Sequence, residues 1–272
     1  MKPILADDLK KIELDILLAI SDFCEKNNLR YFLGYGTLLG AVRHKGFIPW
    51  DDIDIFMPRK DYDILIKKFN SQMDNTPYRA IIPYSKHSKH TILKIGDNRT
   101  LKSEPEYRYT NSTKSGMVDI DVFPLDGTPE NEVQYNTWFE KLYTLYSAYF
   151  SKIRTFKNLN LRERIKLLIK KVFYACFLSK KKIIKESEQL HKEFPYETCD
   201  YVGCIEFCWC AKSHRFNKEA FSDFTFLEFC GHKFKAPIGY DEVLRNLYGD
   251  YMQLPPEKDR VPLHKMNVFW KG

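Results

Sequence analysis

The sequence predicts an α/β fold with a mixed sheet core and an added helical C-terminal lobe. Short segments that alternate apolar and acidic residues lie between about residues 29 and 127, and this alternation is the pattern of half-buried strands. From about residue 130 onward the apolar residues recur at helical spacing instead. No internal repeat or low-complexity linker separates the two parts, so we predict a core at 1–130 and a lobe at 131–272 that packs on it.

The first predicted elements place a glycine-rich turn between a strand and a helix. Residues 12–20 are expected to form an amphipathic helix, because apolar residues recur there among acidic ones. Residues 29–33 are expected to form a strand, whereas 38–43 have helix-forming composition. Gly36 and Thr37 are therefore expected where a strand enters a helix. Backbone N–H groups at such a start attract phosphate oxygens, and glycine permits their close approach.

The next predicted strand carries two carboxylates. Asp52 and Asp54 alternate with Ile53 and Ile55, so the two carboxylates point to one face of the sheet and the two isoleucines to the other. Anions at this spacing repel unless a divalent cation lies between them, and hard oxygen ligands suit magnesium bound together with substrate phosphates. A solvated strand end is the alternative for an isolated Asp-x-Asp. The preceding Gly-Thr turn favours a metal site for phosphoryl chemistry.

A second acidic strand is predicted at 117–123. Asp119 and Asp121 share one face of it, and a separate strand at 91–95 carries Lys94. A carboxylate beside a metal stays ionised, so either of these two aspartates is a candidate second ligand or a base for an attacking hydroxyl.

Basic residues near these segments are candidates for contacts with phosphate. Arg43, His44, Lys45 and Lys94 are the candidates, because cations compensate phosphate charge that metals leave uncovered, although a solvated surface position is the default for Lys and Arg. Arg260 and His264 follow a Pro-Pro turn, and a return to the site and a tail pinned to the core are equally supported. For Asp126, which precedes a glycine, a turn is at least as well supported as a catalytic role.

The second part of the chain is expected to be helical and locally basic. Residues 131–150 are rich in aromatics, and 161–190 form a periodic basic stretch. Between Leu161 and Lys185 there are nine Lys or Arg and one acid, an excess of eight that exceeds the formal net charge of +7 of the whole chain. Apolar residues recur there at helical spacing and leave cations around the sides: they are Leu161, Ile165, Leu168, Ile169, Val172 and Cys176.

Two interpretations of this basic stretch stay open. One is docking on the anionic cytoplasmic leaflet of a membrane, and the other is a core helix with a solvated basic face. Nucleic acid is a third partner for basic charge, but no recognised nucleic-acid module is present, so we expect no nucleic-acid partner.

The compartment is predicted from the N-terminus and the cysteines. The first residues are polar and show no secretory signal, and no apolar run approaches the roughly 20 residues of a spanning helix, so we expect a cytoplasmic protein. Seven cysteines, an odd number, fit reduced thiols. Four lie close together at Cys199, Cys204, Cys208 and Cys210, but without paired Cys-x-x-Cys spacing they favour small apolar positions over zinc ligands.

Taken together, the motifs resemble the LicD family of nucleotidyltransferase-fold transferases, which includes bacterial phosphocholine transferases and the related fukutin-type proteins. Family blocks occur in family order: Gly36 to Asp54, Met57-Pro58-Arg59 with Asp61-Tyr62, Lys94-Ile95-Gly96-Asp97 with Thr100, Asp121 to Gly127, and Tyr248 to Pro256 with Arg260 and His264. One departure concerns the aspartates. The family usually shows three before the isoleucine, whereas only Asp51 and Asp52 precede Ile53 here, which leaves the use of an upstream carboxylate open.

The resemblance implies a metal-dependent transferase with a nucleotidyltransferase-like core. Its donor would be CDP-choline, CMP would leave, and phosphocholine would pass to a hydroxyl of a lipid-linked glycan such as a teichoic-acid precursor. The catalytic and metal site for Mg²⁺ (or Mn²⁺) would be formed by three aspartates, Asp52, Asp54 and Asp121. The donor phosphates would be contacted by Gly36, Thr37, Arg43 and Lys94.

Two alternatives accompany this hypothesis. Within the enzyme class, the chain would transfer another phosphorylated alcohol or sugar from a CDP or UDP donor. Outside it, the chain would be a non-catalytic binding protein of cell-wall assembly whose metal site is degraded by the shortened aspartate run. A lipid-linked acceptor would place the protein on the inner face of the cell membrane as a peripheral protein.

Overall fold

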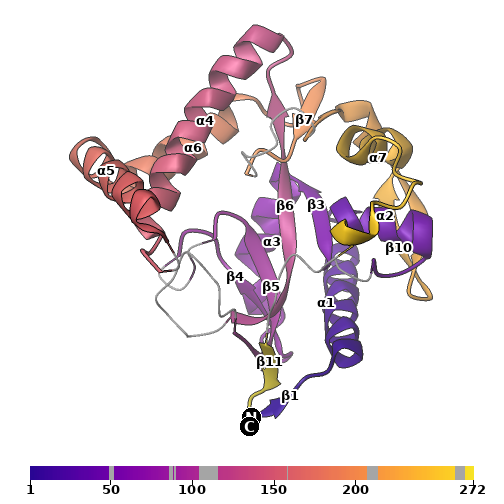
Figure 1. The fold of residues 1–272 in the computed structure, drawn as a ribbon. Helices are drawn as coiled ribbons and strands as arrows, with labels where there is room; N and C mark the ends of the chain where they lie inside the picture. Colours follow the sequence, from indigo (N-terminus) through magenta and orange to yellow (C-terminus); the bar gives the residue numbers. More distant parts are fainter. Residues whose placement is uncertain are drawn as a thin grey trace.

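A computed structural model shows a mixed α/β fold and describes residues 1–48, 52–85, 88, 90–103, 116–157, 159–206, 214–260 and 267–272. A sheet forms the centre and helices surround it (Figure 1). The helices are α1 (Ala6–Lys26), α2 (Tyr35–His44), α3 (Arg59–Gln72), α4 (Glu132–Ile153), α5 (Leu161–Phe177), α6 (Lys180–Glu193) and α7 (Tyr240–Tyr248), with short 3₁₀ turns η1 (Lys218–Phe221) and η2 (Glu257–Asp259). The strands are β1 (Lys2–Pro3), β2 (Phe32–Leu33), β3 (Asp54–Pro58), β4 (Tyr78–Ile81), β5 (Leu93–Ser103), β6 (Gly116–Thr128), β7 (Tyr201–Gly203), β8 (Arg215–Asn217), β9 (Phe224–Phe229), β10 (His232–Pro237) and β11 (Asn267–Trp270).

The central sheet has the order β1-β11-β5-β6-β3-β2. β3 runs parallel to β6, whereas β5 is antiparallel to β6 on its other side, which makes the sheet mixed. The strand expected at 117–123 lies within β6. The strand expected at 91–95 overlaps β5, which begins two residues later than expected, so both strands are confirmed. The strand expected from Asp52 begins two residues later, at Asp54.

The N-terminal elements follow the predicted order. The amphipathic helix is longer than the expected 12–20, and its apolar face, which includes Ile16, Leu17 and Ile20, is buried in the core. The strand expected at 29–33 is reduced to β2, and α2 follows it directly. The glycine-rich segment therefore lies where a strand enters a helix, as predicted.

The helical lobe expected at 131–272 is corrected by the structure. Consecutive helices without an intervening strand run from α4 to α6, which we call the helical extension (132–193). After it the chain returns to the core: β7 pairs with β6, β11 inserts between β1 and β5, and α7 packs against α2. The hairpin of β9 and β10 shows why this part of the chain is not a helical lobe. A period of two in 224–229 favours a strand, and Cys230 and Gly231 close the turn with φ values of 52° and 80°.

One main core and two smaller clusters hold these layers together. The main core joins the sheet to α1, α2, α3 and the returning C-terminal segments, and the smaller clusters lie between α4, α6 and their neighbours. Among the described residues, no helix is both long enough and apolar enough to cross a membrane.

Candidate active site

A row of polar side chains crosses three strands of the sheet. Asp54 on β3 lies opposite Asp121 on β6, and Lys94 on β5 lies opposite Asp121 from the other side. Residues opposite one another on neighbouring strands point to the same face, so the three side chains form one row, which we call the polar row. Asp119, two residues before Asp121, shares this face. The sheet register thus brings together three of the predicted site residues.

Lys94 neutralises two carboxylates at once. Its Nζ donates to Asp119 Oδ1 at 3.0 Å and also to Asp121 Oδ1, and the side chains are largely buried. Burial by itself would raise the pKa of Asp119, but the ammonium groups of Lys102 and Lys94 lower it below its usual value. Burial would lower the pKa of Lys94, yet the two carboxylates raise it well above the usual value. Lys94 is therefore held as a cation.

Asp121 is set apart from Asp119 by its electrostatic surroundings. Burial raises its pKa, Lys94 opposes this, and the negative charges of Asp119 and Asp52 raise it further. The net shift of the Asp121 pKa is upward, so Asp121 is the more basic of the two carboxylates on β6. Since a stronger base accepts a proton more readily near neutral pH, Asp121 suits the role of a proton acceptor better than Asp119.

Thr37 ties the start of α2 to the aspartate segment. Its buried hydroxyl accepts a hydrogen bond from the Asp54 N–H at 2.7 Å and points its own proton toward the Asp52 carbonyl at 3.4 Å. The Gly34 N–H also donates to the Asp54 carbonyl at 3.0 Å. Because the Thr37 hydroxyl is engaged by the backbone, a phosphate contact by Gly36 and Thr37 would come from backbone N–H groups, and it stays a prediction.

Arg43 connects the end of α2 to the C-terminal segment. Its Nη1 donates to the carbonyl oxygens of Tyr251 at 2.8 Å and Gln253 at 3.3 Å. Burial lowers the pKa of Arg43, and the nearby Arg260 adds to this shift. The two predicted placements of Arg260, a return to the site and a tail pinned to the core, both stay predictions. Whether Arg43 contacts the donor stays a prediction.

Two residues near the polar row were not singled out from the sequence. Glu13 on α1 is buried, and burial followed by the negative charge of Asp52 raises its pKa to about 8. In the sequence, the signal for the burial of Glu13 was its position among the apolar residues of the predicted first helix. Burial, together with Lys94, lowers the pKa of His90 to about 4, so this imidazole is neutral at pH 7; no local motif marks it.

The donor chemistry of the polar row fits a hard divalent cation. Carboxylate oxygens from adjacent strands are the ligands that magnesium prefers. Within the described part of the chain, however, no three His, Cys, Asp or Glu side chains already stand in a metal-binding group. Asp51 lies outside the described residues, so the question of an upstream carboxylate stays open, and metal binding by Asp52, Asp54 and Asp121 stays a prediction.

Asp126 has a structural role that differs from both predicted ones. It lies inside β6 and is fully buried, and Arg59 binds both of its oxygens at 2.6 Å. His191 Nδ1 on α6 lies 2.9 Å from Asp126 Oδ2, close but not aligned as a hydrogen bond. Burial would raise the pKa of Asp126, and Arg59 followed by His191 lowers it strongly. Asp126 therefore joins the core to the helical extension.

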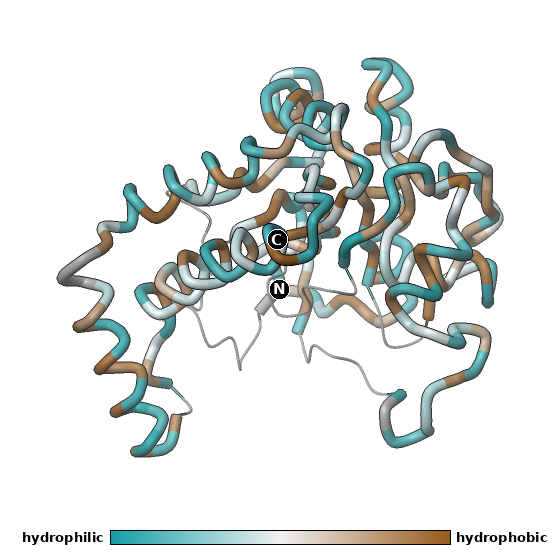
Figure 2. Tube along the Cα trace, turned by 90° about the horizontal axis from the view of Figure 1, so that it is seen from above, coloured by the Kyte–Doolittle hydropathy of each residue, from teal (hydrophilic) through white to brown (hydrophobic). Residues whose placement is uncertain are grey.

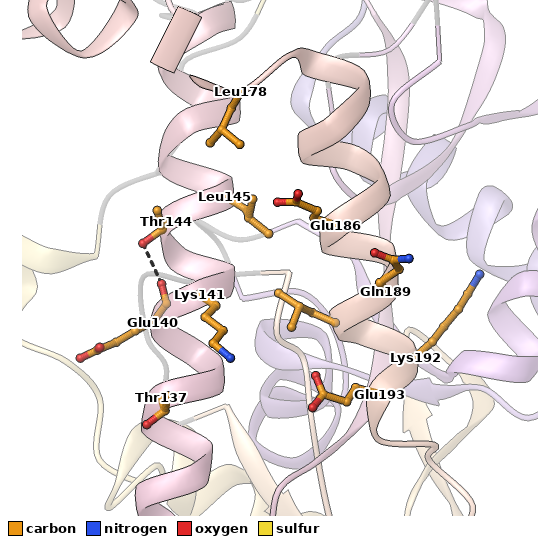
Figure 3. Close-up of a pocket in the computed structure, with 11 residues that line it drawn as sticks. Thr137, Glu140, Lys141, Thr144, Leu145, Leu178, Glu186, Gln189, Lys192 and Glu193 are labelled. Atoms are coloured by element: carbon orange, nitrogen blue, oxygen red, sulfur yellow. Dashed lines mark hydrogen bonds between the residues drawn. The ribbon is translucent and has the colours of Figure 1, made fainter. Parts of the chain in front are cut away.

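Other parts of the chain lie apart from the polar row or outside the described residues. A pocket of about 880 Å³ opens between α4 and α6, and none of the predicted site residues lines it (Figure 3). Cys199 and Cys204 are free thiols, whereas Cys208, Cys210 and His264 lie outside the described residues, so zinc binding is not decided.

The mixed sheet, the glycine-rich entry into α2 and the carboxylates on adjacent strands are typical of nucleotidyltransferase-type transferases. The family described as LicD/FKTN/FKRP, nucleotidyltransferase domain, matches residues 28–163, a span that contains the whole polar row. The chain is 33% identical over 276 residues to the lipopolysaccharide cholinephosphotransferase LicD of Haemophilus influenzae, with 99% of each chain covered. An uncharacterized protein of Rickettsia typhi is 43% identical over 111 residues, which cover 40% of this chain and 32% of that protein. The chain belongs to the LicD family, and it is a transferase.

Proposed function

We propose that this transferase moves phosphocholine from CDP-choline to a hydroxyl of a lipid-linked cell-surface glycan, such as a teichoic-acid precursor, and releases CMP. The observation that carries the proposal is the polar row, in which Asp54 on β3 lies opposite Asp121 on β6 and the buried ammonium group of Lys94 on β5 pairs with Asp121. Full-length similarity to a protein named as a lipopolysaccharide cholinephosphotransferase supports the choline head group and a saccharide acceptor.

The reaction is a substitution at the phosphorus that carries choline. The acceptor oxygen forms a new bond to this phosphorus, and the bond from the phosphorus to the bridging oxygen of CMP breaks, so that CMP leaves with that oxygen. The acceptor proton passes to a base, and Asp121, the carboxylate that lies opposite Asp54 in the sheet, is the residue we assign to this role. The products are a glycan phosphodiester and CMP.

The remaining residues position the reactants and balance charge. Asp52, Asp54 and Asp121 would hold magnesium or manganese, and the bound metal would supply positive charge to the donor diphosphate. Thr37 holds Asp52 and Asp54 in place through their backbone. Lys94 keeps Asp119 and Asp121 oriented toward one face and offsets part of their negative charge. Backbone N–H groups at the start of α2 would contact phosphate oxygens.

The test is the release of CMP from purified protein with magnesium, a nucleotide donor and an oligosaccharide acceptor, followed by liquid chromatography and phosphorus NMR of the product. We expect CDP-choline to yield CMP and a choline phosphodiester on the glycan. Release of nucleotide only from a CDP-polyol or UDP-sugar would support the rival donor, since the polar row recognises diphosphate and not the head group. No release from any donor, with folding confirmed, would favour the non-catalytic binding protein.

A further inference from the structure

The outward face of α5 is apolar, although the helix lies at the surface. Large apolar side chains on it are 50% to 75% exposed: they are Leu161, Ile165, Leu168, Ile169, Val172 and Phe173. All but the last recur at spacings of four, three, one and three residues, which places them on one side of a helix. We call them the α5 stripe.

The other side of α5 attaches the helix to the protein. Leu167 is buried, and Lys171 and Tyr174 are partly buried. Lys171 donates to the Lys152 carbonyl at 3.1 Å, which anchors α5 to the end of α4. The helix projects at the left of the molecule in Figure 1, and in Figure 2 brown hydrophobic residues alternate with teal ones along it. The α5 stripe thus faces away from the protein, which excludes the interpretation as a core helix with a solvated basic face.

Cations border the α5 stripe along its length. Arg162, Lys166 and Lys170 are exposed and follow one edge of it at spacings of four residues. Arg164 and Lys171 lie toward the other edge, and Glu163 is the single acid of the helix. The next helix continues the charge with three consecutive exposed lysines at 180–182. An apolar face between rows of Lys and Arg is the pattern of a helix that lies in a membrane interface, because long cationic side chains reach outward to the headgroups.

We propose that α5 docks in the plane of an anionic lipid bilayer, with the α5 stripe among the acyl chains and the bordering cations at acidic headgroups. The helix has 17 residues and five cations, so it is too short and too charged to span the bilayer. A second copy of this chain is a poor occupant, because two such faces would bring like charges together. The inference does not depend on the transferase reaction, since lipid binding needs neither donor nor acceptor.

The test is sedimentation of the full chain with sucrose-loaded vesicles of equal parts phosphatidylglycerol and phosphatidylcholine, compared with pure phosphatidylcholine. We expect binding to the anionic vesicles, a much weaker binding to the neutral ones, and a loss of binding at high salt. Failure to sediment with anionic vesicles, or equal sedimentation with both compositions, would overturn the proposal.

Two variants with matched controls separate charge from apolar contact. Replacement of Arg162, Lys166 and Lys170 by Gln should lower the vesicle partition coefficient by about tenfold or more, since each cation near an anionic surface contributes up to roughly 1 kcal/mol, a factor of about five. The control replaces three exposed lysines far from α5, Lys26, Lys67 and Lys68, by Gln and should bind like the wild type.

The apolar variant is Ile165→Gln with Ile169→Gln, and its control is Val133→Gln with Phe226→Gln, two apolar positions elsewhere that are also at least half exposed. We expect loss of vesicle binding only in the former, with unchanged circular dichroism. Equal binding by both pairs would reject the α5 stripe. Light scattering without lipid measures the oligomeric state of both proteins. A wild-type dimer that becomes a monomer in the Ile165/Ile169 variant would identify a self-association surface and overturn the membrane proposal.

Discussion

Thr37 is the residue that couples the glycine-rich turn to the carboxylates. Its hydroxyl accepts from the Asp54 N–H in a buried position, and removal of that acceptor leaves the N–H without its partner. We therefore expect Thr37→Val to lower the free energy of unfolding by about 1–3 kcal/mol and to slow CMP release, because the aspartates lose their fixed position. Thr37→Ser should restore both quantities. Urea denaturation and the CMP assay measure them, and a fully active valine variant would contradict the coupling.

Asp54 and Asp121 should be indispensable for transfer. Asn keeps the shape of each side chain but removes an anionic ligand or base, so Asp54→Asn should abolish CMP release, and Asp121→Asn should reduce kcat by about 10²–10⁴. Asp22→Asn, on the exposed surface of α1, is the control. Circular dichroism checks that the variants remain folded. Turnover near the wild-type rate in the Asp54 variant would reject the metal assignment.

His214 links protonation to stability. Burial lowers its pKa to about 4 from the usual 6.5, and its Nδ1 lies 3.0 Å from the Tyr35 hydroxyl. Between these pH values the unfolded chain binds more protons, so the free energy of unfolding falls as the pH falls through this window.

We expect the stability of the wild type relative to His214→Gln to decrease by up to about 1.4 kcal/mol per pH unit below about pH 6.5 and to be constant above about pH 7. Urea titrations at several pH values measure this difference. A difference that does not change with pH would show that His214 is protonated equally in the folded and unfolded states.

Among the elements, β6 is joined to α3 and α6 by a buried ion-pair network. Asp126 is held by Arg59, and the network extends to His191. Removal of one partner leaves a buried charge uncompensated, so Asp126→Asn should lower the free energy of unfolding by about 3–5 kcal/mol. Glu186→Gln, which breaks the exposed pair with Lys182, should cost less than about 0.5 kcal/mol. Comparable costs for both variants in urea denaturation would show that the network contributes little.

The whole molecule brings its two ends together. β1 pairs with β11, with Lys2 opposite Trp270, and β11 in turn pairs with β5 (Figure 1). The last strand therefore completes the sheet that carries Lys94, and Arg43 binds carbonyl groups in the segment just after α7. The chain that follows α6 is thus part of the framework of the site, whereas α4 to α6 extend away from it.

The affinity of the whole site for the donor should depend on a divalent metal. Several carboxylates and a diphosphate repel one another, and the charges of Lys94 and Lys102 do not balance them. We expect calorimetry to show weak CDP-choline binding in chelator and stronger binding when magnesium or manganese is added. Equal affinity with and without metal would contradict metal binding by the aspartates, and a larger effect of calcium than of magnesium would point to a different ion.

Local sequence patterns by themselves determined several parts of this protein. The period of two in the acidic segments placed Asp54 and Asp121 on strands, and the Gly-Thr pair marked the start of α2. These predictions succeeded because glycine conformation and side-chain alternation are properties of neighbouring residues. The order of the family blocks likewise identified the family without any structure.

Only the tertiary structure decided which of these residues meet. The register that sets Asp54 opposite Asp121 joins segments more than sixty residues apart, and no local pattern specifies such a pairing. The same holds for Asp126, whose glycine neighbour suggested a turn although its partner on α3 keeps it in a strand. The apolar residues of α5 have the spacing of a core face, yet the structure exposes them. Helical spacing shows which residues share a face, but the rest of the chain decides whether anything covers it.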